Sequence, residues 1–546
     1  MAEQTPPRMR FWGWGEDARA GALPAHARSF LDEHVGTAAA ERPPVALEQV
    51  RLEPSNLSKD ARAELAAVVG EGNVRVDHAE RVLHAAGKGY PDLVRLRAGE
   101  PEGAPDAVVH PASHDEIRAV LMACAARSIA VVPFGGGTSV VGGVAPLRGS
   151  HEAAIALETG RLGSILSLDQ ESATVTVGAG MRGPALEREL SAKGLTLGHF
   201  PQSFEYVSLG GCAATRSAGQ ASTGYGSIEK MVLGLRLAAP AAEISLPPLP
   251  ATAAGPGVRQ LLVGSEGALG VISEVSLRVR VAPEHHAYEG VFFESFDAGR
   301  EAFRELAREH ALPDVARLSD EAETRMSMAL AGDGGLKGKL GRRYLDARGY
   351  GGGCIAIVGF DGGSYEVGQR RRRTLHLLRR AGGLAVGSSP GHAWREGRFA
   401  APYLRDDLLG LGVMVETLET ATQWSNVARL HRAVTDAIGQ ALAEQGTPGL
   451  VMCHVSHVYE SGASLYFTFL ARQREGAEIE QWQAAKRAAS DAIAAGGGTI
   501  THHHAVGRDH VPWMEREIGP GAIELLRAAK AQLDPAGIMN PGKLLP

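Results

Sequence analysis

Three consecutive histidines, His502, His503 and His504, lie within the run GGTITHHHAVGRD. Imidazole titrates closest to neutral pH of all side chains, so three together indicate either a metal site or a site that handles protons and oxyanions. In an extended segment successive side chains face opposite ways, which predicts His502 and His504 on one face and His503 on the other. That geometry suits a single metal ion poorly. An exposed histidine loop without chemistry is the plainer alternative.

A glycine-rich run, residues 133–143 (PFGGGTSVVGG), follows an apolar segment that is expected to form a strand. Glycines have no Cβ, so their backbone N–H groups can approach an anion closely. The run matches neither the GxGxxG nor the GxxxxGK[ST] fingerprint, and alone it could be only a turn. Two further loops of small residues, HFPQSFEYVSLGGCAATRSAGQ from His199 and LLVGSEGALGVISEV from Leu261, add weight to a phosphate-binding interpretation.

The elements expected around these runs belong to an α+β chain. LSKDARAELAAVVG predicts a helix that begins after Ser58 and ends at Gly70. DAVVH and IAVVPF are expected strands on either side of a helix whose start carries the capping-box pair Ser113 and Glu116. Short strands at ATVTVGAG and RQLLVG, with a helix near RGPALERELSAKG, continue this region to about residue 282.

Later residues alternate strands and helices in two similar halves. GVFFES, VARLS and CIAIVGF are expected strands of the first half, and VMVETLE and a hairpin from LVMCHVSHVY to SLYFTFL belong to the second. The pattern predicts an antiparallel sheet with helices on one face. Strand alternation in SLYFTFL places Ser464, Tyr466 and Thr468 on one face and the apolar side chains on the other.

Composition and charge exclude several classes of protein. A net charge of -6 over 546 residues does not favour nucleic-acid binding, because phosphate neutralisation needs a basic surface. The four cysteines have no zinc-ligand spacing and favour a reducing compartment. No secretion signal, peroxisomal address or apolar stretch long enough for a bilayer is visible. We therefore expect a cytoplasmic protein and leave a peripheral membrane contact open.

The three loops, in this order, resemble the FAD-binding domain of the vanillyl-alcohol oxidase or PCMH type of flavoenzyme. FWGWGEDARA, VARLSDE, PYLRDDLLGLGV, ESGASLYFTFL and THHHAVGRD narrow the resemblance, since they are similar to alkyldihydroxyacetonephosphate synthases in matching order along nearly the whole chain. The resemblance implies a PCMH-type FAD-binding domain (101–282) after a helical N-terminal region (1–100). A ferredoxin-like antiparallel-sheet cap domain for the substrate (283–500) and a C-terminal segment that returns to the FAD domain (501–546) would follow.

By the same resemblance FAD is the cofactor. It is expected to be noncovalent, because the first loop has no histidine or cysteine where some family members attach the flavin. The residues expected to bind it come from all three loops: Pro133, Phe134, Gly135, Gly136, Gly137, Thr138, Ser139, Gln202, Ser203, Ser208, Gly210, Gly211, Thr215, Arg216, Ser217, Glu266, Gly267, Leu269, Gly270, Val271 and Ile272.

Enzymes of this family exchange the acyl group of acyl-dihydroxyacetone phosphate for a long-chain fatty alcohol, which makes the ether bond of ether lipids. Their flavin acts as an electron sink without net oxidation or reduction. The resemblance places the catalytic tyrosine at Tyr466. A phenol, with an ordinary pKa of about 10, needs nearby positive charge or hydrogen-bond donors to act as a base, and the histidine run could supply them.

Three more residues match substrate-site positions of the family. Arg405 is the expected ligand of the substrate phosphate, because a guanidinium offers paired donors and keeps its charge. A salt bridge from Arg405 to Asp406 or Asp407 is the structural alternative. Arg317 and His199 match two further positions. The expected partners are thus acyl-dihydroxyacetone phosphate and a fatty alcohol, with a homodimer left open.

An FAD-dependent dehydrogenase or oxidase for D-2-hydroxy acids, of the D-lactate, glycolate or 2-hydroxyglutarate type, is the alternative on the same fold. Enzymes of that type use paired histidines and a glutamate to bind a divalent metal. Here the matching stretch reads HHHAVG, and His454 and His457 are three residues apart, so they are expected on opposite sides of a strand. We therefore expect no metal and rank the alkyl transferase first.

Overall fold

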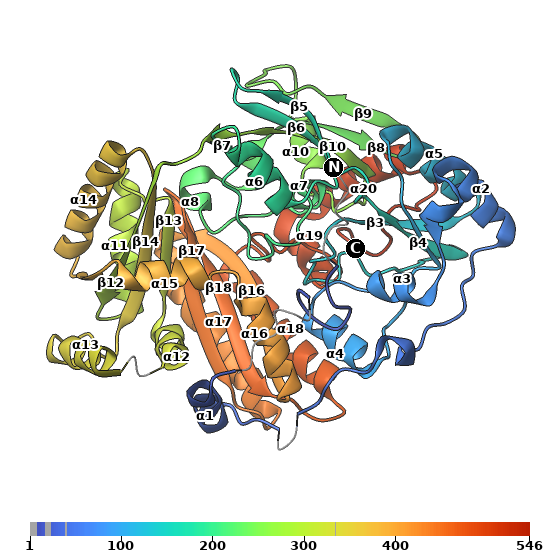
Figure 1. Cartoon of the computed structure of the whole chain (residues 1–546). Coiled ribbons are helices and arrows are strands. Elements are labelled where there is room, and N and C mark those ends of the chain that lie inside the picture. The colour runs from blue at the N-terminus through green and yellow to red at the C-terminus, as the bar shows by residue number, and fades with distance from the viewer. Residues whose placement is uncertain (1–7, 17–22, 39–40, 333–334) are drawn as a thin grey trace.

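The computed structural model describes residues 8–16, 23–38, 41–332 and 335–546. Part of the expected N-terminal region, including residues 17–20 of FWGWGEDARA, lies outside the described residues. A large sheet with its helices, yellow to orange in Figure 1, lies beside two smaller sheets in teal and green. The α+β class predicted from the sequence is confirmed.

The N-terminal region contains helices joined by extended segments. In α2 the Ser58 side chain accepts from the backbone N–H of Ala61, and Gly70 ends the helix at φ 89°, as the sequence predicts. The elements are α1 (Ala25–His34), η2 (Leu47–Gln49), α2 (Lys59–Val69), η3 (Glu71–Asn73), β1 (Val74–Arg75), α3 (His78–Leu83) and α4 (Tyr90–Ala98).

The first small sheet has the order β1-β2-β4-β3 and leads into the glycine-rich run. Both predicted strands and the helix between them are confirmed, as β2 (Ala107–Val109), β3 (Ile129–Phe134) and α5 (His114–Ala126). Ser113 caps α5, but the Glu116 carboxylate accepts from the N–H of Ala112 instead of that of Ser113, so only half of the capping box forms. The remaining strand is β4 (Ala153–Glu158).

The second small sheet has the order β5-β6-β10-β8-β9. The predicted strand at ATVTVGAG and helix at RGPALERELSAKG are confirmed as β6 and α6. The predicted strand at RQLLVG is wrong, because this apolar run forms helix α10; so short a run fits either period, and Gly264 ends it at φ 93°. The elements are β5 (Ile165–Asp169), β6 (Thr174–Gly178), α6 (Gly183–Ser191), β7 (Leu195–Thr196), α7 (Leu209–Ala214), α8 (Ser222–Tyr225), α9 (Ile228–Met231), β8 (Val232–Ala238), β9 (Glu243–Leu246), α10 (Val258–Leu262), β10 (Val271–Arg278) and β11 (Arg280–Val281).

The large sheet has seven strands in the order β15-β12-β14-β13-β17-β18-β16, all paired antiparallel as predicted. Its strands are β12 (His285–Phe293), β13 (Val315–Ser319), β14 (Cys354–Gly362), β15 (Leu384–Gly387), β16 (Val413–Gln423), β17 (Leu450–Val458) and β18 (Gly462–Arg472).

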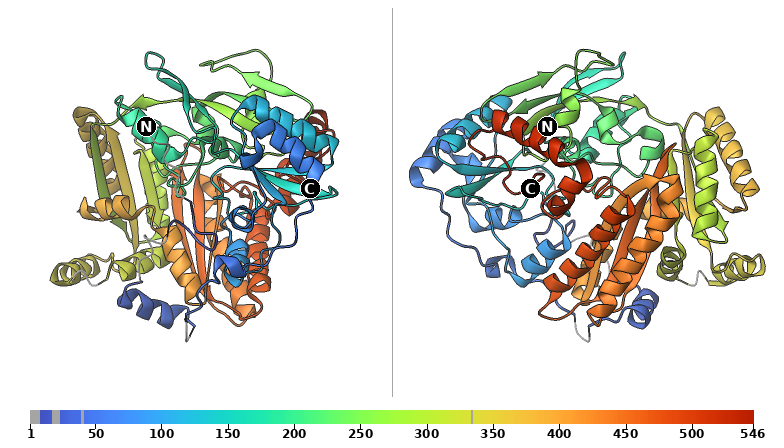
Figure 2. Two further views of the ribbon diagram at one scale, coloured as in Figure 1. Left: turned by 45° about the vertical axis from the view of Figure 1, so that its right-hand side comes forward. Right: turned by 180° about the vertical axis from the view of Figure 1, so that it is seen from behind.

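Helices bury the apolar face of this sheet. α17 and α18 run side by side along it, which Figure 2 shows from behind, and their apolar side chains join those of the strands in one core. The helices are α11 (Phe296–Arg308), α12 (Glu321–Ala331), α13 (Gly335–Ala347), α14 (Ser364–Arg380), α15 (Ser389–Gly397), α16 (Ala401–Gly410), α17 (Trp424–Glu444) and α18 (Glu478–Gly496).

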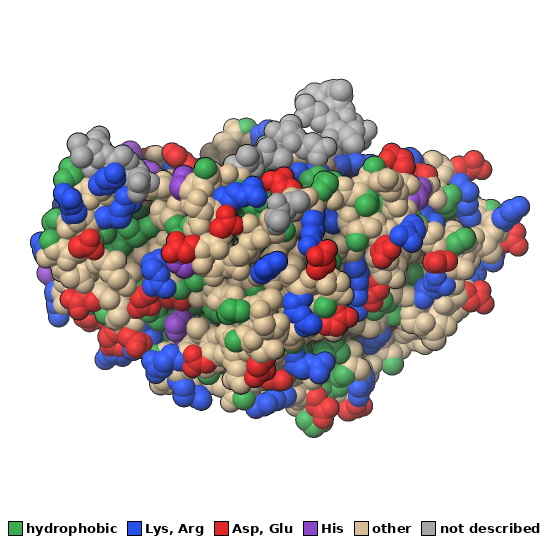
Figure 3. All heavy atoms as spheres, turned by 90° about the horizontal axis from the view of Figure 1, so that it is seen from below, with side chains coloured by type: hydrophobic (Ala, Val, Ile, Leu, Met, Phe, Trp, Pro, Cys, Tyr) green, Lys and Arg blue, Asp and Glu red, His purple; other side chains and the backbone are tan. Residues whose placement is uncertain are grey.

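The last segment runs back along the first small sheet. It contains η4 (Val511–Trp513), α19 (Met514–Ile518) and α20 (Pro520–Leu533), and Met539 forms a parallel bridge with Val131 of β3. Among the described residues, no helix has the length and apolar character required to span a bilayer. On the face drawn in Figure 3, positive and negative side chains are interspersed.

Candidate active site

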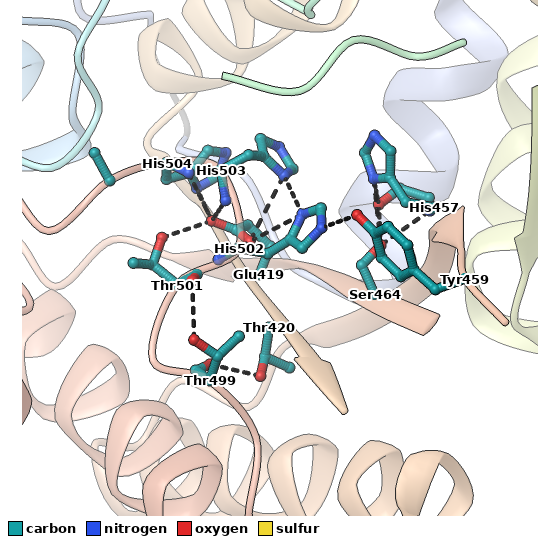
Figure 4. A network of polar contacts seen from close by, with 12 residues as sticks. Glu419, Thr420, His457, Tyr459, Ser464, Thr499, Thr501, His502, His503 and His504 are labelled. Atoms are coloured by element: carbon teal, nitrogen blue, oxygen red, sulfur yellow. Dashed lines mark hydrogen bonds and ion pairs between the residues drawn. The ribbon is translucent and has the colours of Figure 1, made fainter. Parts of the chain in front are cut away.

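The three histidines surround one buried carboxylate, that of Glu419 on β16. The backbone N–H groups of His502, His503 and His504 all donate to it, at 2.9 Å and 2.7 Å for the last two, and the Thr501 hydroxyl donates at 2.8 Å (Figure 4). The expected alternation of faces is therefore wrong. The segment bends because three successive N–H groups point at one carboxylate, and each imidazole lies within 4.0 Å of it.

Burial sets the charge of this cluster. Burial would raise the pKa of Glu419, but the imidazoles and the His503 N–H hold it well below its usual range, so the carboxylate is ionised. Burial lowers the pKa of His502, His503 and His504 to about 4, although Glu419 opposes the shift. The histidines are thus neutral at neutral pH. They can donate and accept hydrogen bonds, but they do not supply the positive charge considered from the sequence.

Tyr466 lies on the polar face of β18, as the alternation predicts. Leu465, Phe467 and Phe469 are fully buried in the core on the other face. The Tyr466 ring stacks on His503 with centroids 6.0 Å apart and meets His504 edge-on at 5.5 Å. Burial raises the pKa of Tyr466 to about 12, so the phenol keeps its proton at neutral pH.

His454 and His457 lie on the same side of β17, contrary to the expectation of opposite faces. A register shift between Val455 and Val458 inserts a bulge that turns His457 toward the histidine run. Its ring centroid is 4.9 Å from that of His502 and 5.5 Å from that of His503, whereas His454 stacks on Tyr466 at 4.9 Å.

The bulge also bears on the expected absence of a metal. His457, His502 and His503 each bring one ring nitrogen within 4.8 Å of the others, a grouping that could hold an ion. Both geometric reasons given against a metal, the alternation of the run and the opposite faces of β17, are therefore wrong. The absence of a metal stays a prediction.

Arg317 and His199 join the same site from two sides. Arg317 on β13 contacts the His454 ring at 2.8 Å and donates to the Glu323 carboxylate at 2.9 Å. Burial would raise the pKa of Glu323, but Arg317 and His454 lower it to about 2. His199 is buried, with Nε2 3.1 Å from the Ser217 hydroxyl, and its Nδ1 has no partner among the described residues.

Arg405 does not contact the histidines or Tyr466 through any described hydrogen bond. Its guanidinium donates to the Lys88 carbonyl at 2.7 Å and to the Asp406 carboxylate at 3.1 Å, so the structural alternative considered from the sequence does form. Asp406 also accepts from the backbone N–H of Trp14, which ties FWGWG to α16. The side chain of Arg405 is 14% exposed.

The three glycine-rich and small-residue loops pack against each other. A Cβ added to Gly135 would lie 2.2 Å from the Ser208 hydroxyl, and one added to Gly267 would lie 2.7 Å from the Pro133 ring. The Glu266 carboxylate accepts from the N–H groups of residues 506 and 507, at 2.8 and 2.7 Å, so the third loop holds the chain just after the histidines. Burial raises the pKa of Glu266 to about 7.

The side chains of several predicted cofactor residues form hydrogen bonds within the protein. Arg216 donates to the carbonyls of Gln260 and Val263, and Gln202 donates to that of Arg398. Thr215 donates to the Gly211 carbonyl.

Sequence reasoning missed Glu419 and Tyr459, whose hydroxyl is 2.5 Å from Nε2 of His502, and it considered His454 and His457 only as metal ligands expected on opposite faces. Two glutamates within an otherwise apolar strand, VMVETLE, were a signal for Glu419, since a carboxylate is rarely buried without partners.

Comparison with known proteins agrees with this geometry. Residues 105–245 match the family model "FAD binding domain", and residues 282–544 match "FAD linked oxidases, C-terminal domain". The chain is 34% identical to alkyldihydroxyacetonephosphate synthase of Trypanosoma brucei brucei over 504 residues, covering 91% of this chain and 82% of the relative. This chain belongs to the alkyldihydroxyacetonephosphate synthase family.

The structures of relatives confirm the fold. A solved alkyldihydroxyacetonephosphate synthase superposes with a TM-score of 0.86 at 28% identity, covering 98% of this chain and 99% of that one. p-Cresol methylhydroxylase superposes at 0.68 and 14% identity over 90% of this chain and 98% of that one, a likeness in fold alone. The predicted PCMH-type FAD-binding domain with an antiparallel cap domain is thus confirmed.

As a member of the synthase family, the chain uses FAD, and the loops fit it. At Gly135 and Gly267 a Cβ would clash with the neighbouring loops, so glycine lets the three loops pack closely into the small-residue cradle that a pyrophosphate requires. The Ser265 hydroxyl and the Asn540 amide oxygen are buried beside the third loop without partners among the described residues. Such orphaned polar atoms need a partner that the protein does not supply.

Proposed function

We propose that this synthase-family chain exchanges the acyl group of acyl-dihydroxyacetone phosphate for a long-chain fatty alcohol and so forms alkyl-dihydroxyacetone phosphate. The observation that carries the proposal is Tyr466, which stacks on the neutral His503 and meets the neutral His504 edge-on, in a segment that the third loop holds just after the histidines. When bound, FAD supplies an electron-accepting ring for an exchange without net oxidation or reduction. The lack of histidine and cysteine in residues 133–139 supports noncovalent binding.

Tyr466 and the histidines are proposed to carry out different proton transfers of the exchange. Tyr466 acts as a phenolate, formed when its phenol proton passes to a neutral imidazole of the histidine run. It takes the proton from the carbon next to the ketone and returns it after the exchange, and the nearby Arg317 guanidinium and a hydrogen bond with Thr417 partly offset the burial that raises its pKa. The fatty acid leaves as a carboxylate with the electrons of its C–O bond. The alcohol oxygen forms the new C–O bond and gives up its proton, for which a neutral imidazole of His503 or His504 is a suitable acceptor.

Arg317 contacts the His454 ring that stacks on Tyr466, and it is proposed to bind the substrate phosphate together with Arg405. Glu323 and His454 fix Arg317 in place. His199, buried beside the second loop of small residues, is proposed to contact the substrate.

One assay separates this function from its rival. Purified yellow protein is incubated with palmitoyl-dihydroxyacetone phosphate and hexadecanol, and in parallel with D-lactate or D-2-hydroxyglutarate and a redox dye. Ether product without dye reduction supports the transferase, whereas dye reduction by a hydroxy acid without ether product rejects it. Elemental analysis is part of the test, because a stoichiometric metal at His457, His502 and His503 would favour the hydroxy-acid enzyme.

The setting of the enzyme is also a proposal. Four buried, unpaired cysteines, Cys124, Cys212, Cys354 and Cys453, support a reducing compartment such as the cytoplasm.

On α13, Leu340 and Tyr344 are 56% and 49% exposed, one helical turn apart, and Arg343 and Arg348 lie beside them. This helix face supports peripheral contact with a membrane that supplies the long-chain substrates. A homodimer is tested by light scattering of the purified protein.

A further inference from the structure

A second cavity, of about 410 Å³, lies outside the site described above. Its volume falls within the range of small-molecule sites, roughly 300–1,000 Å³. Four stretches of chain form its walls: the segment after η2, helices α3 and α4 with the turn that follows α4, residues 145–148 after the glycine-rich run, and Arg508.

The walls carry more positive than negative charge. Five arginines and three carboxyl groups line the cavity: Arg51, Arg81, Arg95, Arg148, Arg508, Glu53, Asp92 and Glu102. Three of the arginines have carboxylate partners, since Arg51 pairs with Glu100 at 2.8 Å, and Arg95 and Arg508 both pair with Glu102, at 2.5 and 2.9 Å. Burial raises the pKa of Asp92 to about 6, and the Asp92 carboxylate accepts from the backbone N–H of Gly89.

Arg81 and Arg148 are the arginines left with surplus charge. Arg81 is only 8% exposed. Its guanidinium donates to the backbone carbonyls of Pro105 and Glu53, at 2.7 and 2.8 Å. Among the described residues, Arg81 forms no ion pair with a carboxylate, and Asp106 acts on it only through longer-range charge attraction. Arg148 reaches the Asp106 carboxylate only at 3.8 Å, with the Asn56 amide beside it.

Asp106 cannot neutralise both guanidinium groups. Its two oxygens already accept from the backbone N–H groups of Asn56 and Ala154, at 2.7 and 2.8 Å. Burying an arginine without a charged partner is costly, which applies to Arg81. Arg148 is 44% exposed and lines the same cavity, so the two guanidinium groups together favour an anion between them. Two guanidinium groups facing one space match the several acceptor oxygens of a phosphate.

The rest of the cavity is apolar. Its lining includes Leu52, Ala85, Ala86, Leu96, Pro101, Ala104, Pro146 and Leu147. A ligand suited to it therefore has one anionic end and a compact carbon framework.

Chain continuity and hydrogen bonds link the walls of the cavity to the glycine-rich run and to the segment after the histidines. Residues 145–148 continue directly from the glycine-rich run, and Lys543 donates to the Ala145 carbonyl at 2.6 Å. Arg508 follows His504 by four residues, and its backbone N–H donates to the Val141 carbonyl at 3.0 Å. An occupant that moves Arg148 or Arg508 would act on both segments.

We propose that this cavity is a second binding site, separate from the transferase site, for a small organic phosphate monoester held between Arg81 and Arg148. Its phosphate accepts from both guanidinium groups, and its carbon framework lies against the apolar wall. A nucleotide and a glycerol phosphate share this chemistry.

Calorimetric titration of the FAD-loaded enzyme tests the site with 5′-AMP, glycerol 3-phosphate and, as the uncharged counterpart, adenosine. We expect one or both phosphates to bind and adenosine not to bind, and the stronger phosphate identifies the source. Arg148→Gln should weaken that binding at least about tenfold while turnover is kept. Arg118→Gln is the matched control, because its side chain is 42% exposed against 44% for Arg148, and it should bind like wild type.

Two further variants exclude misleading results. Arg317→Gln removes a proposed phosphate ligand of the transferase site, so phosphate binding that survives it but is lost in Arg148→Gln belongs to the cavity. Arg81→Gln should also weaken binding, and its thermal unfolding reports whether the fold is intact. Equal affinity in wild type, Arg148→Gln and folded Arg81→Gln, or no binding of either phosphate at millimolar concentration, overturns the proposal.

Discussion

Glu419 and Tyr466 are cross-strand neighbours in the antiparallel pairing of β16 with β18. One carboxylate therefore does two things at once. It holds His502, His503 and His504 through their backbone N–H groups, and its charge adds to the burial that raises the pKa of Tyr466. Glu419 thus positions the histidines but makes the Tyr466 phenol harder to deprotonate. The nearby Arg317 guanidinium acts in the opposite direction, because its positive charge lowers the pKa of Tyr466.

Glu419→Gln tests the positioning role. An amide cannot accept three N–H groups and the Thr501 hydroxyl as a carboxylate does, so the histidine segment should shift. We expect turnover to fall by about 10²-fold or more, and the free energy of unfolding to fall by about 3 kcal/mol, because a buried charge network is broken. Steady-state kinetics and urea unfolding measure the two effects.

Glu416→Gln is the matched control for that variant. Glu416 is buried on the same strand, but its carboxylate accepts from the Trp482 indole N–H among the helices, away from the histidines. It should lose stability while keeping most of its turnover per folded, flavin-loaded molecule. Equal loss of turnover in both variants would show that Glu419 acts only through general stability.

Tyr466→Phe tests the base. The variant keeps the ring that stacks on His503 and His454 and removes only the hydroxyl. Turnover should fall at least about 10²-fold, whereas the yellow FAD absorbance per chain should not change. Tyr459→Phe, which removes the hydroxyl bonded to His502, should cost less. An active Tyr466→Phe enzyme would reject Tyr466 as the base.

Local patterns predicted the scaffold well, because they act over a few residues. The cap at Ser58 and the two faces of β18 follow from rules of helix ends and strand alternation. RQLLVG was predicted wrongly because six residues contain too little periodicity to separate a strand from a helix.

The site was harder to predict, because its shape depends on long-range contacts. Glu419 precedes His502 by 83 residues, yet it sets the bend of the histidine run. The bulge between Val455 and Val458 turns His457 to the same face of β17 as His454, whereas simple strand alternation predicts the opposite face. Burial, which only the folded chain supplies, makes the histidines neutral.

Arg317→Lys and Arg405→Lys compare the two proposed phosphate ligands. Lysine keeps the charge but loses the paired donors of a guanidinium. Because Arg317 lies beside Tyr466, its lysine variant should raise KM for acyl-dihydroxyacetone phosphate about tenfold and also lower kcat. Arg405→Lys should mainly raise KM. An unchanged KM in Arg405→Lys, with a lower melting temperature, would limit Arg405 to its contacts with Lys88 and Asp406.

Replacement of Leu340 and Tyr344 by aspartate tests the proposed membrane contact. Both side chains are exposed, so the fold and melting temperature should not change, but binding to anionic lipid vesicles in a flotation assay should decrease severalfold. Turnover of a substrate presented in detergent micelles should stay at the wild-type level. Leu525→Asp, at an exposed leucine on α20, is the control and should float like wild type. Flotation that is equal in all three proteins would remove α13 from the proposal.

The neutral histidines predict how stability depends on pH. In the folded protein the pKa of His502, His503 and His504 is about 4, against an ordinary value of 6.5. Between these values the unfolded chain binds more protons than the folded one, so the free energy of unfolding should be fully present above about pH 6.5 and should fall as the pH decreases toward 4. Urea unfolding at a series of pH values measures the slope. His504→Gln, which removes one of these groups, should have a shallower slope than wild type over this window, and identical slopes would show that His504 is not held neutral by burial.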